Sequence, residues 1–287
     1  MTDKSYKFTI LMLFAMLFWA GGWSALKILT ESVGVEVLTF WRFVIMFVSF
    51  IPILFIIKVP LRLPKKSIKH ILSSSILNIF FMFFAYLGVK HSTAGSGGVI
   101  ITVMSPLFTF VLSLFILKQA HTKLQYIGLA IGLIGGAIML NIHNLNAFNT
   151  GEFYFILAAI TWAVVTLIAQ KSHLHINTIH YSFFIASISM IILFFLTLPY
   201  DTSIIFNQDK KFWISLLYLG IFGQTIATTI FMIASGKLGS TQASSFMFLV
   251  PIFALIIAYL VLGETIKLNI VIGGTISLIA VYFINKK

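Results

Sequence analysis

The chain has 287 residues, of which 60% are hydrophobic and only 9% are charged, with a formal net charge of +12 at pH 7. A soluble globular domain carries about 25% charged residues, so this composition excludes such a domain and predicts an integral membrane protein. The absence of cysteine also excludes disulfides and thiolate metal sites.

Ten apolar segments follow one another along the chain, each close to the roughly 20 residues that a membrane-spanning helix needs. Their connections are short and rich in proline, asparagine, glycine and charge. The first segment lacks a clear small-residue cleavage site, so we interpret it as a retained helix rather than a signal peptide. The sequence therefore predicts an all-α integral membrane protein with ten transmembrane helices. The predicted spans are 8–29, 35–57, 68–90, 94–117, 122–142, 151–171, 178–199, 212–235, 241–262 and 267–285.

The distribution of lysine and arginine predicts the orientation. If the N-terminus lies inside, the inner segments hold 13 of the 19 basic residues, as the positive-inside rule expects. Both termini are then cytoplasmic, in a multi-pass protein of the cytoplasmic (inner) membrane. The basic charge faces anionic lipid and does not indicate a nucleic-acid partner, because it is scattered over short loops.

A similar row of polar and aromatic side chains recurs on the first and sixth predicted helices. Trp19 and Trp162 lie at the middle of the first and sixth segments, where an indole N–H needs a partner other than water. Each tryptophan begins a row of side chains spaced by four residues, which therefore share one helix face. The two rows are Trp19, Trp23 and Lys27, and Trp162, Thr166 and Gln170.

The chain divides into two halves of five spans, 1–145 and 146–287. Ser105-Pro106 in the fourth span matches Val250-Pro251 in the ninth, 145 residues later. Because five is odd, the second half enters the membrane the opposite way round. Inverted repeats are typical of secondary transporters, whose substrate site lies near mid-membrane between the repeats.

Several short motifs occur in a fixed order along the chain. They are Phe18-Trp19-Ala20-Gly21-Gly22 with Lys27, Phe40-Trp41-Arg42-Phe43, Ser105-Pro106-Leu107, and Pro251, Leu262-Gly263-Glu264 and Gly273-Gly274. In their order and spacing these motifs resemble, over essentially the whole chain, the ten-helix EamA-type members of the drug/metabolite transporter superfamily. The resemblance implies an inner-membrane exporter of small metabolites or drugs that works by alternating access. In one departure, Lys118-Gln119 stand where first halves of the family often carry Gly-Glu.

Polar and aromatic side chains at mid-depth are the candidate substrate site. Unpaired amides are costly in hydrocarbon, so Asn78 and Gln224 should face a wet cavity or bond across helices as structural contacts. Arg42 is either an anchor for an anionic group of the substrate or a residue that snorkels to the outer surface. The candidate substrate-binding residues are Trp19, Trp23, Lys27, Arg42, Asn78, Tyr86, Trp162, Thr166, Gln224, Thr228 and Ser245.

Two prolines and a set of glycines shape the helices. Pro106 and Pro251 each delete one backbone hydrogen bond at mid-span, and they are gating points or static kinks. Small-residue faces in the fifth and tenth spans predict close helix packing. Their residues are Gly128, Gly132, Gly135 and Gly136, and Gly273, Gly274 and Ser277.

No aspartate or glutamate lies near the middle of any predicted span. This favours a facilitator that exports amino acids or similar amphipathic solutes over a proton-coupled multidrug or cation exporter. A receptor or assembly subunit that moves no solute is the alternative of another class. The histidines are dispersed, so we expect no enzyme, and we expect no cofactor and no metal.

Overall fold

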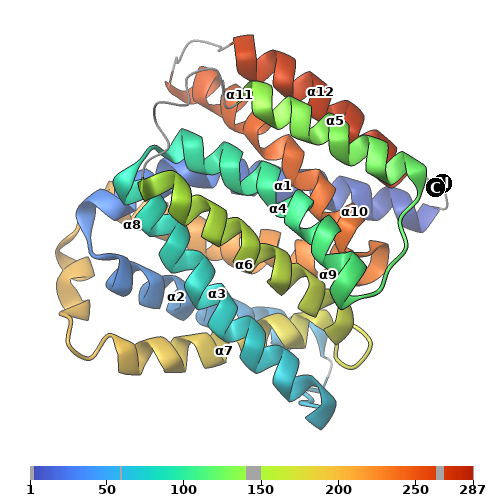
Figure 1. Cartoon of the computed structure of the whole chain (residues 1–287). Coiled ribbons are helices and arrows are strands. Elements are labelled where there is room, and N and C mark those ends of the chain that lie inside the picture. Colours follow the sequence, from blue (N-terminus) through green and yellow to red (C-terminus); the bar gives the residue numbers. More distant parts are fainter. Residues whose placement is uncertain (1–2, 59, 140–149, 263–267, 287) are drawn as a thin grey trace.

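The protein is a bundle of helices (Figure 1), as described by a computed structural model over residues 3–58, 60–139, 150–262 and 268–286. These residues contain no strand, and the expected fold class is confirmed. The first half comprises α1 (Asp3–Ser32), α2 (Val35–Ile57), α3 (Lys65–His91), α4 (Ala94–Ile116) and α5 (Lys123–Met139). The second half comprises α6 (Thr150–Ser172), α7 (Thr178–Leu196), a short 3-10 helix η2 (Thr202–Asn207), α8 (Lys210–Leu217), η3 (Tyr218–Ala227), α9 (Thr228–Leu238), α10 (Ser240–Ser245), η4 (Phe246–Leu249), α11 (Val250–Leu262) and α12 (Leu268–Asn285).

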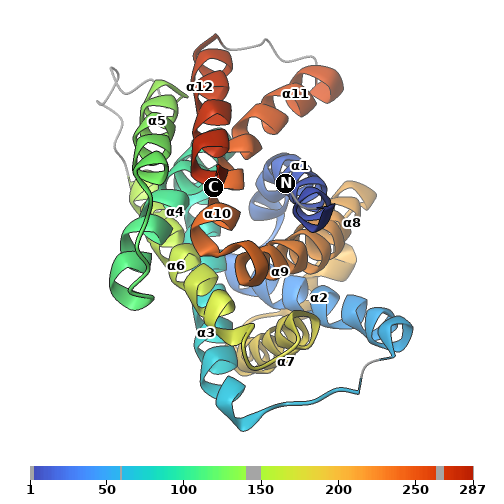
Figure 2. The same cartoon turned by 90° about the vertical axis from the view of Figure 1, so that its right-hand side faces the viewer.

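The helices have the length and hydropathy of membrane spans. Among the described residues, seven spans have at least 18 residues and are apolar enough to cross a membrane. Three apolar helices are shorter there, namely 123–139, 240–254 and 271–285. The predicted ends at 140–142 and Lys267 lie outside the described residues. The protein is therefore a multi-pass membrane protein, and the start of α1 and the end of α12 lie on one side of it (Figures 1 and 2).

Over the residues that the structure describes, the eighth and ninth spans depart from a regular α-helix. The eighth runs without a gap from Lys210 to Leu238, but its middle, η3, is a π-helix. The ninth contains the 3-10 turn η4 directly before α11. Pro251 is the second residue of α11 and has no N–H to offer the preceding turn. Pro106, its counterpart, lies inside α4 without such a break.

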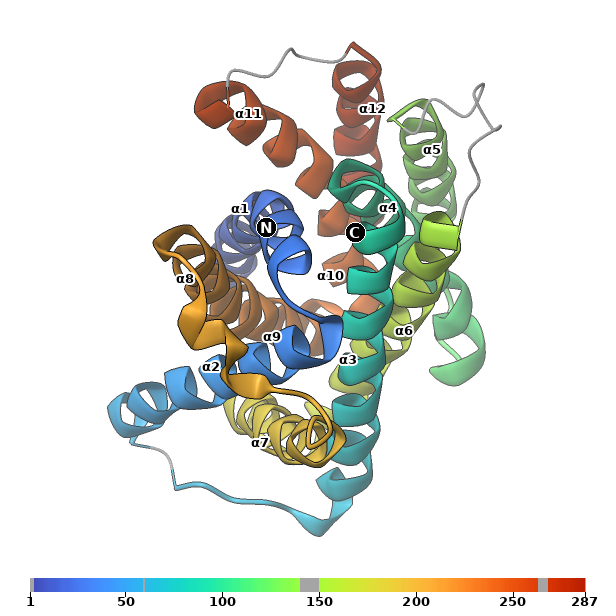
Figure 3. The same cartoon turned by 90° about the vertical axis from the view of Figure 1, so that its left-hand side faces the viewer.

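The helix contacts follow one pattern, in which each contact of a first-half helix has a counterpart made by the equivalent helix of the second half. The contact of α3 with α6 corresponds to that of the eighth span with α1, and α4 with α6 corresponds to α11 with α1. The pairs α2–α7 and α5–α12 correspond to themselves, and they form opposite edges of the bundle (Figures 2 and 3). This correspondence is what a duplicated five-helix unit requires.

Small residues bring α5 and α12 into backbone contact, as predicted. A Cβ atom added to Gly135 would lie 2.6 Å from the carbonyl oxygen of Gly273, and one added to Gly273 would lie 2.4 Å from that of Gly135. Only glycine permits this approach, so the two helices pack through their main chains.

Candidate functional site

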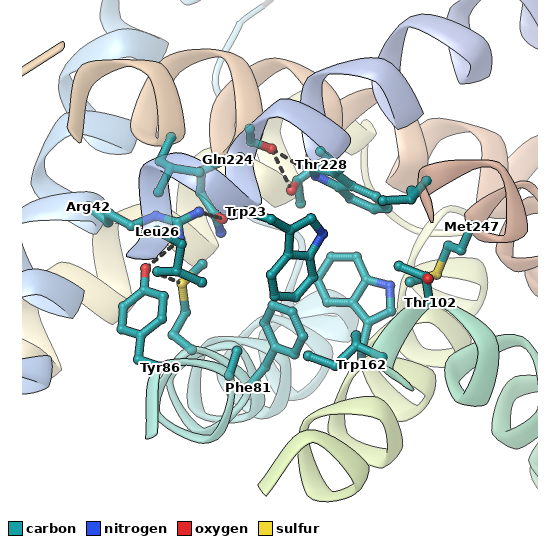
Figure 4. Close-up of a pocket in the computed structure, with 18 residues that line it drawn as sticks. Trp23, Leu26, Arg42, Phe81, Tyr86, Thr102, Trp162, Gln224, Thr228 and Met247 are labelled. Carbon is teal, nitrogen blue, oxygen red and sulfur yellow. Dashed lines mark hydrogen bonds between the residues drawn. The ribbon is translucent and has the colours of Figure 1, made fainter. Parts of the chain in front are cut away.

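A cavity of about 90 Å³ lies between the two halves of the bundle (Figure 4). The first half contributes residues of α1, α2, α3 and α4, and the second contributes residues of α6, η3, α9, η4 and α11. Such a position between repeats is where secondary transporters bind their solutes. The lining residues are Trp19, Gly22, Trp23, Leu26, Arg42, Phe81, Met82, Ala85, Tyr86, Ile101, Thr102, Trp162, Leu219, Gly223, Gln224, Thr228, Met247 and Val250.

The guanidinium of Arg42 forms the polar end of the cavity. Arg42 is 7% exposed. Its Nη1 donates to the hydroxyl of Tyr86, and its Nη2 donates to Oε1 of Gln224 at 3.1 Å. The Tyr86 hydroxyl in turn donates to the sulfur of Met82 at 3.2 Å. Helices α2 and α3 of one half and η3 of the other are thereby linked through a single cation.

Aromatic rings form much of the remaining wall. Trp19 and Trp162 meet edge to face, with ring centroids 5.4 Å apart, and Phe81 lies 4.8 Å from Trp162. Phe231 packs behind both indoles at 5.1 and 5.5 Å. Figure 4 shows Arg42 and Tyr86 at one end and Trp23, Phe81 and Trp162 beyond them, so a solute would meet a charge and an apolar surface together.

The π-helix exposes a carbonyl oxygen beside the cavity. The oxygen of Gly223 accepts from the indole N–H of Trp19 at 3.0 Å and from the hydroxyl of Thr228 at 3.1 Å. The Thr228 bond spans five residues, as does the bond from the Thr225 hydroxyl to the Gly220 oxygen. In an α-helix such hydroxyls reach back three or four residues, so these side chains follow the wider turn.

Seven of the eleven predicted substrate-binding residues line one cavity. They come from five separate segments of the chain, which shows how the fold gathers them. These seven are Trp19, Trp23, Arg42, Tyr86, Trp162, Gln224 and Thr228.

The other four lie elsewhere. Lys27 forms an exposed salt bridge with Glu31 at 3.2 Å. The Asn78 amide is buried and donates to the backbone oxygen of Ser74 on its own helix, which is neither the cavity position nor the bond across helices that was expected. Both hydroxyls of the remaining pair bond within their own helices, Thr166 to the Trp162 oxygen and Ser245 to the Gln242 oxygen.

Neither proline lines the cavity. Pro106 and Pro251 are both buried, although Val250, the residue before Pro251, is part of the wall. Their use in gating stays a prediction.

The apolar residues of the wall were not among the residues predicted to bind substrate. Phe81, Met82 and Ala85 follow Asn78 by about one and two turns of α3, and Thr102 and Met247 close the other end. Apolar residues at helical spacing are indistinguishable in sequence from core residues. One signal in the sequence could have located these residues. Asn78 and Tyr86 were both candidate site residues, and the missed residues of α3 lie between them on the same helix.

Comparison with known proteins agrees with this architecture. The profile of the EamA-like transporter family matches residues 7–141 and again residues 149–286. The uncharacterized transporter YoaV of Bacillus subtilis is 25% identical over 264 residues, covering 90% of this chain and 89% of that one. An S-adenosylmethionine uptake transporter of Rickettsia prowazekii is 25% identical over 192 residues, covering 64% of this chain and 61% of that one.

A crystal structure shares the fold, with a TM-score of 0.75 at 17% identity over 97% of this chain and 96% of that chain. The family match takes in nearly all of the sequence and repeats once in each half. The chain therefore belongs to the EamA-like transporter family and is a membrane transporter of small solutes.

Proposed function

We propose that the protein is a secondary transporter that exports small amphipathic solutes across the cytoplasmic membrane by alternating access. The observation that carries this proposal is the cavity, because both halves of an inverted repeat contribute to it. A solute held there can be released to either side when one half tilts against the other. The positive-inside distribution supports cytoplasmic termini.

The described lining also supports a facilitator. It contains a guanidinium, a primary amide, hydroxyls and indoles, but no carboxylate. A proton-coupled cation exporter needs a group that exchanges a proton for the cation, and no described lining residue supplies an acid. We therefore infer that the solute runs down its own gradient. One relative is named for uptake of S-adenosylmethionine, so the direction of transport by this protein has to be measured.

Flux into liposomes containing the purified protein tests the proposal. A solute gradient without a pH gradient should drive flux above that of protein-free liposomes. Trp162→Leu should reduce flux, because it removes an indole from the cavity wall. Trp213→Leu is the matched control, since Trp213 is partly buried on α8 and lies outside the wall.

Strict dependence on an imposed pH gradient would contradict the facilitator. Absence of flux for every solute that binds would contradict transport itself. Equal loss of flux in the two tryptophan variants would contradict the assignment of the cavity as the site.

A further inference from the structure

Within the part of the chain that the structure describes, the buried guanidinium of Arg42 has only neutral hydrogen-bond partners. Tyr86 and Gln224 accept hydrogen bonds from the guanidinium, and its central carbon, Cζ, lies 5.5 Å from the centroid of the Tyr86 ring. An arginine is always protonated, and a buried charge is costly unless a counter-charge compensates it. The described part of the cavity therefore holds a positive charge that the protein itself does not balance there.

Four carboxylates with described side chains are bonded away from Arg42, and a fifth, Glu36, forms no salt bridge with it. The one salt bridge among the described residues joins Lys27 to Glu31. Glu152 accepts from the hydroxyl of Ser92, and Asp209 accepts from the backbone N–H of Phe212. Asp201 is likewise bonded within its own turn, by Ser203. Glu36 lies in the first turn of α2, well over a turn before Arg42, and forms no salt bridge.

The unpartnered polar atoms of the described lining are all hydrogen-bond donors. They are Nε of Arg42, Nε2 of Gln224 and Nε1 of Trp162, and each is buried. The carboxamide oxygen of Gln224 and the carbonyl oxygen of Gly223 are already bonded. These N–H groups are enclosed in the wall, so a bound solute meets the positive charge of the guanidinium, which matches an anion.

The rest of the wall limits the solute's body. Indole and phenyl rings offer apolar faces beyond the guanidinium. The cavity of about 90 Å³ has room for roughly six to nine waters, at about 10–15 Å³ each. A solute of about that many non-hydrogen atoms fits.

We propose, building on the transport function above, that the cavity selects small organic monocarboxylates with an apolar or aromatic body and no α-ammonium group. The carboxylate binds at Arg42 and Gln224, and the body lies against Trp23, Phe81 and Trp162. In an α-amino acid the ammonium is two bonds from the carboxyl carbon, so it would lie beside the guanidinium and meet like charge. This inference narrows the amphipathic solutes expected from the sequence to one charge class.

Binding of three ligands with one carbon skeleton tests the inference. Benzoate is an anion, benzamide is neutral and benzylamine is a cation, and their sizes are nearly equal. Isothermal titration on the purified full chain should give benzoate an affinity at least about tenfold higher than benzamide, the effect of one charge-assisted hydrogen bond. Valine should bind more weakly than 3-methylbutanoate, which has the same skeleton without the ammonium group.

Arginine variants connect the preference to one residue. Arg42→Gln should bring benzoate to the affinity of benzamide. Arg62→Gln should leave the preference intact, because Arg62 is exposed in the loop before α3. Arg42→Lys keeps the charge without the fork of donors, and it should retain part of the preference.

Equal binding of benzamide and benzoate by the wild-type protein would overturn the inference, as would absence of benzoate binding at millimolar concentration. The wild-type comparison decides even where Arg42→Gln does not fold. Transport is measured separately by flux, so preferential binding of benzoate with no flux of any solute that binds would refute the proposed function and leave this inference standing.

Discussion

Trp19 and Trp162 occupy equivalent places in the two halves and meet with an interplanar angle of 80°, yet their N–H groups have different fates. The Trp19 N–H donates to the carbonyl oxygen of Gly223. The Trp162 N–H is buried without a partner among the described residues. One indole thus joins the two halves by a hydrogen bond, and the other lines the cavity without one.

Replacing each tryptophan by phenylalanine should separate these roles. Trp19→Phe removes an existing hydrogen bond, so we expect it to lower the free energy of unfolding by about 0.5–1.5 kcal/mol. Trp162→Phe removes no bond and should instead weaken solute binding. Thermal unfolding and titration of both variants check this. A Trp162→Phe protein as unstable as Trp19→Phe, with unchanged affinity, would contradict the assignment.

The contact of α5 with α12 should not accept a methyl group. Gly135→Ala places a Cβ atom 2.6 Å from a backbone oxygen, and overpacking of this kind costs about 1–3 kcal/mol. Gly95→Ala is the control, since its nearest neighbour would be 3.9 Å away and alanine favours the helix. Melting temperatures should fall for the first variant and not for the second. Equal melting temperatures would show that the helices separate easily.

His121, in the loop between α4 and α5, should make stability depend on pH. Its ring stacks on Phe110 with centroids 4.0 Å apart and hydrogen-bonds to Ser113. Burial lowers the pKa of His121 below its ordinary value of 6.5, so the unfolded chain takes up the proton first as the pH falls. This contribution to stability is complete above pH 6.5 and is lost as the pH falls through the folded pKa.

Melting temperatures of wild-type protein and His121→Gln between pH 8 and pH 5 measure this effect. The wild-type protein should lose more stability than the variant on acidification, because the groups they share contribute equally. Parallel curves would show that His121 does not titrate differently in the folded and unfolded chains.

Reporter fusions test the orientation. Reporters at the C-terminus and in the 143–150 loop should lie on opposite sides of the membrane, because five spans separate them. A third reporter near Arg62 should agree with the C-terminal one. Agreement of the first two instead would contradict the inverted arrangement.

The sequence was most informative where polar groups interrupt apolar helices. Trp19, Arg42 and Gln224 were singled out because each is costly in lipid without a partner, and all three line the cavity. The same reasoning failed to place Asn78, since an amide can satisfy one donor on its own helix, as this one does at the oxygen of Ser74. The free-energy cost of an unpaired polar group in lipid predicts that the group has a hydrogen-bond partner, but it does not identify the partner.

The helical spans were predictable because their hydropathy is set by the bilayer, but their internal irregularities were not. The π-helix at 218–227 packs against α1, where its Tyr218 hydroxyl donates to the backbone oxygen of Phe18 at 3.0 Å. Gly21 and Gly22 leave room for Tyr218 and Leu219 at that contact. Such a turn results from tertiary contacts that local propensity does not contain.

The π-helix also means that the eighth span holds more residues than a straight α-helix of the same rise would. A chain that lost one residue between Tyr218 and Ala227 would be free to close the regular four-residue hydrogen-bond ladder. Because the wide turn takes up the extra residue within itself, the side chains beyond the deletion would keep close to their present faces. The change would instead fall on the turn itself, where the hydroxyls of Thr225 and Thr228 bond five residues back. The wide turn is therefore a local alteration of the wall beside Gly223, inserted without redirecting the rest of the span.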